Sequence, residues 1–480
     1  MTSEGHEVAR LVPWIGGQPW PAQQFDELVE PYSGRVVALV GRTDHSAVES
    51  ALASADDGRR AMAKMPLHER VRLLRALADL LESRAEELAR EITTSTGKVI
   101  SHARREARRA PWTVRAAATA GESLAAPSMA ADAMPGGEGV LFLAARRPVG
   151  IVAAVTPFNA PLNLVLHKVA PALAVGNSVV IKPSEAVPGP AIRLAEMCTA
   201  VGFPDGAVNA LPGDAETGRA LLADDRVALI TFTGGTVAGR QIRAAAGLRP
   251  VLLELGGNSA NIVHRDADVA LAVSECVVGG FSNNGQSCNS VQRVIVHREI
   301  FHAFREQLLS RVAGLRTGDP MDPETDVGPL ISEASAIRVI DSIERARAAG
   351  AEVLIGGTRV GATVAPAVIS RVGAEQDLYC EEVFAPVVLL EEYAELSDAF
   401  DRANSTRFAL QAAIFTSSLS TSMRAFEELR AGSIIVNRSS NFRLDQLPYG
   451  GIGESGLGRE GPLFAAESMT YIKSLVVNAN

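Results

Sequence analysis

The chain has 480 residues, of which 47% are hydrophobic and 21% are charged, a balance typical of a soluble globular protein. Its formal net charge of -9 argues against a nucleic-acid or anionic-membrane partner, because both select basic surfaces. No apolar run reaches the roughly 18 residues that span a bilayer. We expect no secretory signal, since the first ten residues carry acidic groups and no apolar segment. The length predicts two or three domains.

Cysteine usage points to an intracellular protein. The four cysteines, at positions 198, 276, 288 and 380, are spread without a paired or metal-ligand spacing. This pattern is too sparse for a disulfide scaffold and is typical of the reducing cytoplasm. We therefore expect a cytoplasmic protein with neither disulfides nor a metal site.

The first quarter of the chain reads as helical. Apolar residues three and four apart, with Glu and Arg on the other faces, predict two helices over residues 46–95. More helix is expected over 104–119. The Ala-, Pro- and Gly-rich stretch 123–139 breaks this pattern, and strands are predicted over 140–155.

From there the chain alternates strand, loop and helix. Short apolar strands separated by helices predict a parallel α/β sheet. A second round of alternation starts after residues 252–263, so we place a domain boundary near residues 250–257. The Gly- and Pro-punctuated stretch 437–462 is expected to be a functional loop. The last run, 469–480, alternates like an edge strand and could pair with another subunit.

Two segments of the first α/β unit suit a nucleotide. FTGGTVAG, at 232–239, is a strand, a Gly-rich turn and a helix start, an arrangement whose backbone amides can hold a phosphate. In IKPSE, Lys182 and Glu185 offer a cation and a carboxylate for ribose hydroxyls or a phosphate. The alternatives are a plain strand-to-helix turn and a solvated corner.

Three further residues could perform chemistry. Glu254, after apolar residues in LLELGG, would gain basicity from burial at a strand end. Asn159 lies between two prolines in TPFNAPLN and could donate to an oxyanion. Cys288 has a polar, compact approach in NNGQSC that an inert core thiol does not need. The alternatives are an exposed turn carboxylate, an Asx turn and a buried thiol.

Taken together, these motifs resemble one family. The order TPFN, KPSE, FTGGTxxG, ELGG, GQSC, EEVFAP and PYGGxxxSGxGREG is similar to the aldehyde dehydrogenase superfamily over nearly the whole chain. Glu254 and Cys288 are 34 positions apart, as in that family. The resemblance implies a small-molecule aldehyde as substrate and NAD or NADP as cofactor, with NAD favoured because Glu185 would repel a 2′-phosphate.

The resemblance also implies roles for single residues. Cys288 would attack the aldehyde carbon to give a thiohemiacetal, with the oxyanion held by the Asn159 amide and the Cys288 backbone N–H. After hydride transfer, Glu254 would activate the water that hydrolyses the thioester. Lys182 and Glu185 would contact the adenosine ribose, and Glu382 the nicotinamide ribose. The full set of implied cofactor contacts is Thr156, Pro157, Lys182, Glu185, Gly213, Phe232, Gly235, Thr236, Leu255, Glu382 and Phe384.

This sequence departs from the family pattern at three places. Gly235 replaces a pyrophosphate-contacting Ser, Ala385 replaces Gly, and RFAL at 407–410 replaces the commoner YGL. None of these removes a group that the reaction requires.

The substrate is less well defined by the sequence. The tail and TPFNAPLN resemble the branch of lactaldehyde, phosphonoacetaldehyde and non-phosphorylating glyceraldehyde-3-phosphate dehydrogenases, which implies a small, anionic or hydroxylated aldehyde. Arginines recognise such anions well, and Arg109 and Arg443 are the two candidates. Both could instead form ion pairs that only hold the domains together. Ala160 and Ser287 replace the His and Arg of phosphonoacetaldehyde enzymes. Trp112 and Phe158 could line an apolar tunnel for a semialdehyde or aromatic aldehyde. The candidate substrate contacts are Arg109, Phe158, Ser287 and Arg443.

The implied fold is α/β, with two parallel-sheet domains and a small oligomerisation β-arm, assembled as a homodimer or homotetramer. The cofactor-binding, Rossmann-like domain would comprise residues 1–124 and 148–255, the catalytic domain 256–455, and the arm 125–147 and 465–480. Two other functional classes compete with the aldehyde dehydrogenase interpretation. One is a cofactor-independent thiol hydrolase or esterase, for which His167 and His297 are the nearest bases in the sequence. The other is a catalytically silent binding protein.

Overall fold

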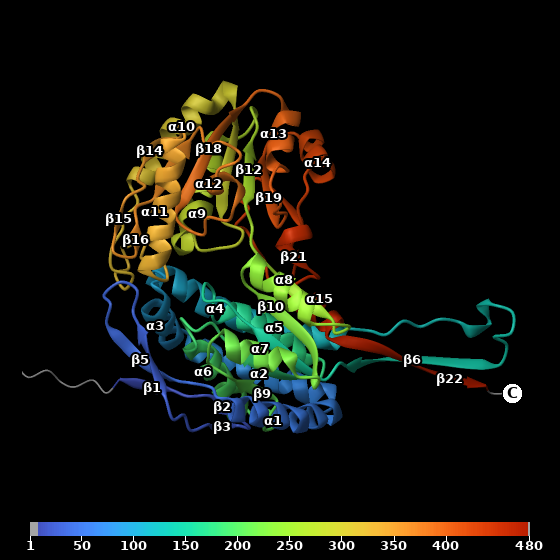
Figure 1. The fold of residues 1–480 in the computed structure, drawn as a ribbon. Coiled ribbons are helices and arrows are strands. Elements are labelled where there is room, and N and C mark those ends of the chain that lie inside the picture. Colours follow the sequence, from blue (N-terminus) through green and yellow to red (C-terminus); the bar gives the residue numbers. More distant parts are fainter. Residues whose placement is uncertain (1–7, 479–480) are drawn as a thin grey trace, which may run out of the picture.

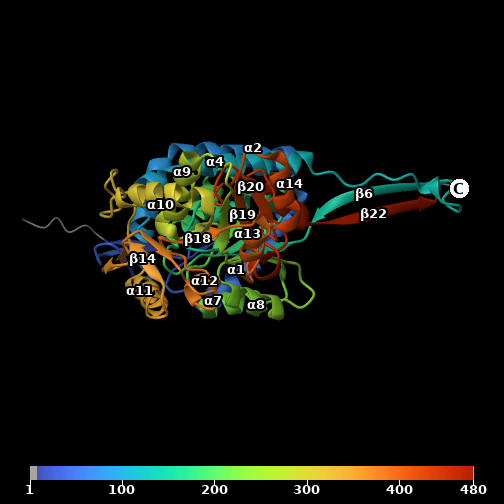
Figure 2. The ribbon, with the colours of Figure 1, turned by 90° about the horizontal axis from the view of Figure 1, so that it is seen from above.

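The computed structural model describes residues 8–478. Two sheet-containing domains lie against each other, and a long two-stranded arm extends from one of them (Figures 1 and 2). Residues 1–7, which hold much of the stretch behind the expectation of no secretory signal, lie outside the described part, as do residues 479–480. Within the described part, the helices are too short or too polar to cross a membrane.

Residues 45–96 form three helices where the periodicity predicts two. Pro66 lacks an N–H and ends the first helix, whereas the second break, at Arg84, has φ -104° and ψ 12° and carries neither Pro nor Gly. The prediction of two helices over 46–95 is wrong because the amphipathic period continues across Arg84. The four N-terminal helices are α1 (His45–Lys64), α2 (Leu67–Ser83), α3 (Ala85–Thr96) and α4 (Ile100–Ser123).

The first domain contains an eight-stranded sheet. Its central strands are parallel and buried, as the apolar runs predict. Their carboxyl ends place Thr156, Lys182, Thr233 and Glu254 at one edge of the sheet, where ligands of open α/β sheets bind. The strands, in spatial order, are β21 (Gly456–Leu457), β11 (Val251–Glu254), β10 (Val227–Thr233), β7 (Ile151–Val155), β8 (Ser178–Lys182), β9 (Val208–Ala210), β2 (Trp14–Ile15) and β3 (Gln18–Pro19). Helices α5 (Asn163–Ala174), α6 (Gly189–Ala200), α7 (Ala215–Ala223) and α8 (Thr236–Ala245) connect or follow them, and β1 (Ala9–Leu11), β5 (Val36–Gly41) and β4 (Phe25–Val29) form a separate small sheet.

The second domain contains a seven-stranded sheet that is parallel except for β14. The chain passes into it between Glu254 and Ser259, next to the boundary predicted at 250–257. Its strands, in spatial order, are β14 (Glu352–Ile355), β17 (Ala367–Ser370), β18 (Val387–Tyr393), β13 (Val291–His297), β12 (Ser259–Val263), β19 (Gln411–Phe415) and β20 (Ser433–Val436). Its helices are α9 (Val269–Phe281), α10 (Arg298–Ala313), α11 (Glu333–Ala348), α12 (Asp377–Cys380), α13 (Leu396–Ala403) and α14 (Leu419–Glu428), and β15 (Arg359–Val360) pairs with β16 (Thr363–Val364).

The C-terminal segment returns to the first domain before it enters the arm. Strand β21 extends the first sheet, and α15 (Pro462–Ser468) packs against α4 and α5. The predicted arm segment 465–480 therefore begins inside a helix, because Ala465, Ala466 and Met469 are buried in the core of the first domain. The arm itself consists of β6 (Val140–Pro148) and β22 (Thr470–Asn478), paired antiparallel along their whole length (Figure 1).

Candidate active site

The loop that carries Cys288 is held in an unusual backbone conformation. Asn283 and Asn284 have φ of +54° and +57°, a left-handed region in which asparagine is one of the better tolerated residues. The Asn284 side chain donates to the carbonyl oxygens of Gly97 (3.0 Å) and Pro329 (2.8 Å) and accepts from a backbone N–H. These three buried hydrogen bonds offset the backbone strain of the positive φ angles and fix the loop.

Neighbouring side chains hold the same loop from the first domain. The Asn283 backbone N–H donates to Nδ1 of His102 at 3.0 Å, and its side-chain amide donates to the carbonyl oxygens of Asn159 and Gln286. Burial, with the nearby cations, lowers the pKa of His102 to about 3, so its ring stays neutral and can accept. A side chain at Gly285 (φ +71°) would overlap the backbone of the 385–386 segment. The loop thus packs closely against both domains.

Both predicted oxyanion donors lie at this loop. Asn159 is buried, and its Nδ2 donates to the Gln286 carbonyl oxygen at 3.0 Å, which uses one of its two hydrogens. The backbone N–H of Cys288 donates no hydrogen bond within the described residues. One amide hydrogen and one backbone N–H are therefore available beside the sulfur.

The Cys288 thiol has one side-chain partner. Its Sγ lies 3.1 Å from the Tyr449 hydroxyl. The residue is partly accessible because it faces two cavities, but removal of the sulfur from water raises the pKa of Cys288 to about 12, with Tyr449 acting against this and Glu382 and Glu254 adding to it. The resting sulfur is therefore a protonated thiol near neutral pH.

Two cavities meet at Cys288. A cavity of about 590 Å³ runs along the edge of the first sheet, and another of about 430 Å³ lies between α4, α5 and the loop 438–449. Cys288 and Asn159 line both of them. A molecule in one cavity and a molecule in the other would thus meet at the sulfur, which is the arrangement a two-substrate reaction requires.

Glu254 ends β11 and lines the larger cavity. The residue is only 4% exposed, and its Oε2 has no hydrogen-bond partner among residues 8–478. Burial and the neighbouring Glu460 carboxylate raise the pKa of Glu254 well above its ordinary value, against the nearby cations. A carboxylate with a raised pKa is a stronger base than an ordinary one, which suits proton abstraction from water.

A close contact joins the Glu254 segment to the nucleophile. A side chain at Gly257 would overlap the carbonyl oxygen of Cys288, so only glycine fits between them. The Gly257 N–H donates to Oε1 of Glu382 at 2.9 Å, and burial raises the pKa of Glu382 to about 7. The ELGG motif therefore positions the base, the thiol backbone and a second carboxylate together.

The larger cavity is lined by most of the predicted cofactor contacts. Those in its wall are Thr156, Pro157, Lys182, Glu185, Gly235, Leu255, Glu382 and Phe384. Three others do not line it. Gly213 precedes the residue that caps α7, Phe232 is buried in the core below the sheet, and the Thr236 hydroxyl donates to the Glu454 carbonyl oxygen at 3.3 Å.

The wall of this cavity fits a dinucleotide. Thr156 Oγ1, Thr233 Oγ1 and Glu254 Oε2 are buried polar atoms without hydrogen-bond partners in the described part of the chain, and all three residues line it. Such atoms are rare in folded proteins and indicate groups that a ligand satisfies. The N-terminus of α8 begins after Gly235, where a side chain would meet open space, so backbone amides there can approach a phosphate.

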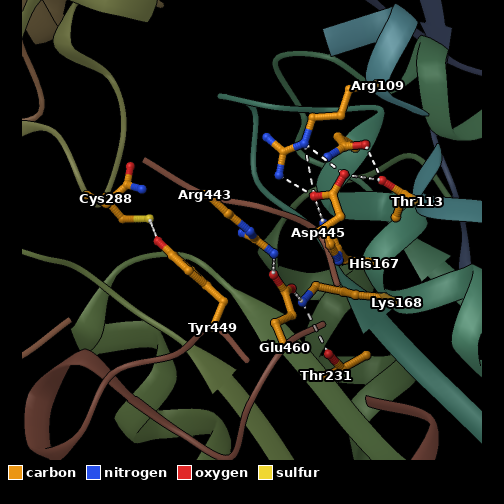
Figure 3. Close-up of polar contacts among 12 residues, drawn as sticks. Arg109, Thr113, His167, Lys168, Thr231, Cys288, Arg443, Asp445, Tyr449 and Glu460 are labelled. Carbon is orange, nitrogen blue, oxygen red and sulfur yellow. Dashed lines mark hydrogen bonds and ion pairs between the residues drawn. The ribbon is translucent and has the colours of Figure 1, made fainter. Parts of the chain in front are cut away.

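The two candidate substrate arginines both form ion pairs and both line the smaller cavity. Arg109 binds both carboxylate oxygens of Asp445, and Arg443 lies 2.9 Å from Glu460 (Figure 3). Both arginines thus form the ion pairs that were the alternative to substrate binding. Nε of Arg443 is nevertheless buried and has no hydrogen-bond partner within the part of the chain that the structure describes.

The other candidate substrate contacts, Ser287 and Phe158, line different cavities. Ser287 lines the smaller cavity, while Phe158 lines the larger one, edge-on to Phe384 with ring centroids 5.8 Å apart. Trp112 is 65% exposed, stacks with Arg115 and lines neither cavity. The tunnel hypothesis is wrong for Trp112, because α4 turns this position to solvent.

A buried polar network that the sequence motifs do not predict lies beside the thiol. It contains Tyr449, Asp445, Glu460 and Lys168, and Figure 3 shows how they lie around Arg443. Tyr449 stands in the quoted PYGG motif, but no local pattern indicates that its hydroxyl reaches a sulfur 161 positions away.

The two histidines weighed as hydrolase bases serve other contacts. His167 is fully buried, with Nε2 2.9 Å from Asp445. His297 accepts from the Glu299 N–H and caps α10. No histidine in the described part of the chain hydrogen-bonds Cys288, and no group of three His, Cys or acidic side chains there could hold a metal ion.

The chain is similar to known proteins over nearly its whole length. The model of the aldehyde dehydrogenase family matches residues 20–475. A 3-sulfolactaldehyde dehydrogenase of Priestia aryabhattai is 41% identical over 466 residues, covering 97% of each chain. Among solved structures, aldehyde dehydrogenase 21 of Physcomitrella patens, in complex with the reaction product succinate, is 35% identical with a TM-score of 0.96, covering 98% of this chain and 99% of the other. The glyceraldehyde-3-phosphate dehydrogenase GapN of Methanocaldococcus jannaschii, complexed with NADP, is 35% identical with a TM-score of 0.90, covering 95% and 100%.

Proposed function

Because this chain belongs to the aldehyde dehydrogenase family and is an NAD(P)-dependent oxidoreductase, we propose that it oxidises a small, anionic or hydroxylated aldehyde to the carboxylic acid at Cys288. The observation that carries this proposal is the position of Cys288 and Asn159 in the walls of both cavities. One cavity fits a dinucleotide, and the other leaves room for a small aldehyde.

In the proposed reaction the Cys288 thiol gives its proton to water, and the sulfur forms a bond to the aldehyde carbon while the carbonyl π electrons move to oxygen. The Asn159 amide and the Cys288 backbone N–H donate to that oxyanion. Bound NAD or NADP supplies the hydride acceptor that turns this adduct into a thioester. Glu254 then takes a proton from a water molecule, and the resulting hydroxide displaces the Cys288 thiolate and releases the acid.

The chain's own residues account for the binding of the cofactor. We assign Lys182 and Glu185 to the adenosine ribose, the N-terminus of α8 to the phosphates, and Glu382 to the nicotinamide ribose. Lys182 Nζ lies 3.8 Å from the Glu185 carboxylate, so the pair can present a cation and an acceptor to adjacent hydroxyls. The negative charge of Glu185 favours NAD over NADP.

The charge of the smaller cavity supports an anionic substrate. Five cationic and two acidic side chains line it. Lys98, Arg109, Arg438 and Arg443 have carboxylate partners, whereas Arg105, on α4, has no ion pair within the described residues. A sulfonate, phosphate or carboxylate would find an uncompensated cation there. The relatives named for sulfolactaldehyde and for succinate as product are in line with this chemistry.

One assay tests the reaction class. Reduced nicotinamide is followed by absorbance with aldehyde, in the wild type and in Cys288→Ala. A dehydrogenase needs the cofactor and loses turnover in the variant, whereas ester turnover without cofactor would indicate a hydrolase. Absence of both would indicate a binding protein.

A panel of aldehydes tests the substrate class. Steady-state kinetics would compare sulfonated and phosphorylated aldehydes, succinate semialdehyde, lactaldehyde and benzaldehyde. We expect Arg105→Gln to raise KM for the anionic aldehydes and to leave lactaldehyde unchanged. Arg108→Gln is the matched control, because Arg108 is exposed on the same helix and outside the cavity. Highest kcat/KM on benzaldehyde would contradict the proposal.

The exposed apolar side chains of the arm, β6 and β22, indicate that the chain forms an oligomer. Several of its apolar side chains are about half exposed, which is unusual for a surface in water. We propose that they are covered by other copies of this chain in a homodimer or homotetramer, which sedimentation would test. These side chains are Leu141, Leu143, Tyr471, Ile472, Leu475 and Val476.

A further inference from the structure

Tyr449 contacts the reacting sulfur of the proposed reaction and is itself held rigidly. The Tyr449 residue is 4% exposed, and its hydroxyl makes its hydrogen bond to Cys288 Sγ at 3.1 Å. Its backbone pairs with that of Glu460, with an N–H and a carbonyl oxygen each engaged. The guanidinium carbon of Arg443 lies 3.9 Å from the centre of the Tyr449 ring (Figure 3). The hydroxyl therefore has little freedom to point elsewhere.

The arginine beneath the ring is fixed in turn. Arg443 Nη2 donates to Glu460 Oε2 at 2.9 Å, and Glu460 Oε1 accepts from Lys168 Nζ at 3.0 Å. Lys168 Nζ also lies 3.2 Å from the Thr231 hydroxyl on β10. Buried, hydrogen-bonded ion pairs of this kind restrict one another's orientation. Within the described residues, only Nε of Arg443 lacks a partner among the buried side-chain nitrogen and oxygen atoms of Arg443, Glu460 and Lys168. The network thus connects the first sheet to the sulfur through one stacked tyrosine.

The surroundings of the sulfur otherwise disfavour its charged form. Burial raises the pKa of Cys288, and the carboxylates of Glu382 and Glu254 raise it further. Of the groups that face the thiol, Tyr449 and Arg443 act in the opposite direction. The Asn159 amide donates one hydrogen to Gln286 rather than to sulfur. A thiolate formed here needs a donor, and Tyr449 is in position.

We propose that the Tyr449 hydroxyl donates a hydrogen bond to the Cys288 thiolate and stabilises the nucleophile, with Arg443 across the ring making the hydroxyl a stronger donor. The hydroxyl keeps its own proton throughout, so no group is transferred. Tyr449 is in this sense a catalytic residue, since it touches the reacting atom. The inference rests on the proposed function only in naming the thiolate as the nucleophile.

Alkylation of Cys288 by iodoacetamide tests this without aldehyde or cofactor. The Tyr449→Phe variant retains the ring on Arg443 and removes only the hydroxyl. Loss of one hydrogen bond to a charged group raises a thiol pKa by about one to two units. The higher pKa lowers the fraction of thiolate at a fixed pH near 8. A more basic thiolate is also more nucleophilic, which recovers part of this loss, so the alkylation rate should fall about 4- to 15-fold.

A matched control separates this effect from a loss of packing. Tyr379 also lies against an arginine, with Arg293 5.1 Å from its ring centre, and donates to Glu391. Tyr379→Phe removes a comparable hydroxyl and should leave the alkylation rate unchanged. Cys380 is a second, partly accessible cysteine, so alkylation is read by mass spectrometry on the peptide that contains residue 288. Cys288→Ser, which should lose the label on that peptide alone, confirms the alkylated site.

The outcomes are distinct. A lower rate of Cys288 alkylation in Tyr449→Phe alone, with an unchanged melting temperature, supports the proposal. An unchanged rate, or an equal fall in Tyr379→Phe, overturns it. If the chain proves to have no dehydrogenase activity, the alkylation result still reads the Tyr449–Cys288 contact, so the two failures are distinguishable.

Discussion

Asp445 organises the wall of the smaller cavity, and its removal gives the most quantitative prediction. Its carboxylate accepts from Arg109 Nε at 2.8 and 2.9 Å, from the Thr113 hydroxyl at 2.9 Å and contacts His167 Nε2 at 2.9 Å. Burial by itself would raise the pKa of Asp445. The hydrogen bonds from His167 and Arg109 outweigh burial and hold this pKa well below its ordinary value. Asp445→Ala would leave the buried His167 without its partner.

The magnitude follows from these contacts. Breaking a buried ion pair by removing one partner costs about 3–5 kcal/mol, and Arg109, whose side chain is 37% exposed, can recover part of this through water. We expect Asp445→Ala to lower the free energy of unfolding by about 3 kcal/mol. At about 2–4 °C per kcal/mol for a domain of 150–250 residues, that is a fall of roughly 6–12 °C in melting temperature.

The pH dependence provides a sharper test. The pKa of Asp445 is depressed in the folded state, so its contribution is present above the unfolded pKa of about 4 and is lost as pH falls below it. The difference in melting temperature between wild type and Asp445→Asn should therefore be constant from pH 8 to pH 5 and narrow below about pH 4. Calorimetry would measure it. A difference that stays constant or widens in acid would refute the assignment of a charged, paired Asp445.

Three predictions concern the reaction centre. Asn159→Ala should lower kcat about 100- to 1,000-fold in steady-state assays, since it removes an oxyanion donor, and Asn159→Asp should not restore it. Glu254→Gln should allow one burst of reduced cofactor and then stall as a thioester seen by mass spectrometry; continued turnover at the wild-type rate would contradict its role. Gly257→Ala should impair both activity and stability, because its methyl group would overlap the Cys288 carbonyl oxygen; a fully active, equally stable variant would show that the backbone gives way.

Local sequence determined the parts of this protein that depend on neighbouring residues. The apolar strands ending at Lys182 and Glu254, the Gly-rich turn before α8, and the strained NNG approach to Cys288 are all recorded in short motifs. Such motifs constrain backbone dihedrals and strand ends over a few residues, and parallel strands then bring their carboxyl ends to one edge. The main features of the sheets and the position of the larger cavity follow from this.

Other features were decided only by the packing of distant segments. Whether Arg109 meets a substrate or Asp445 depends on how the loop 438–449 folds back onto α4, 336 positions away. The same return places Tyr449 on the Cys288 sulfur and buries Ala465 in the first domain. The packing of α4 decides that Trp112 faces solvent. These outcomes rest on contacts between elements far apart in the chain, and their energies depend on burial and orientation that no local pattern contains.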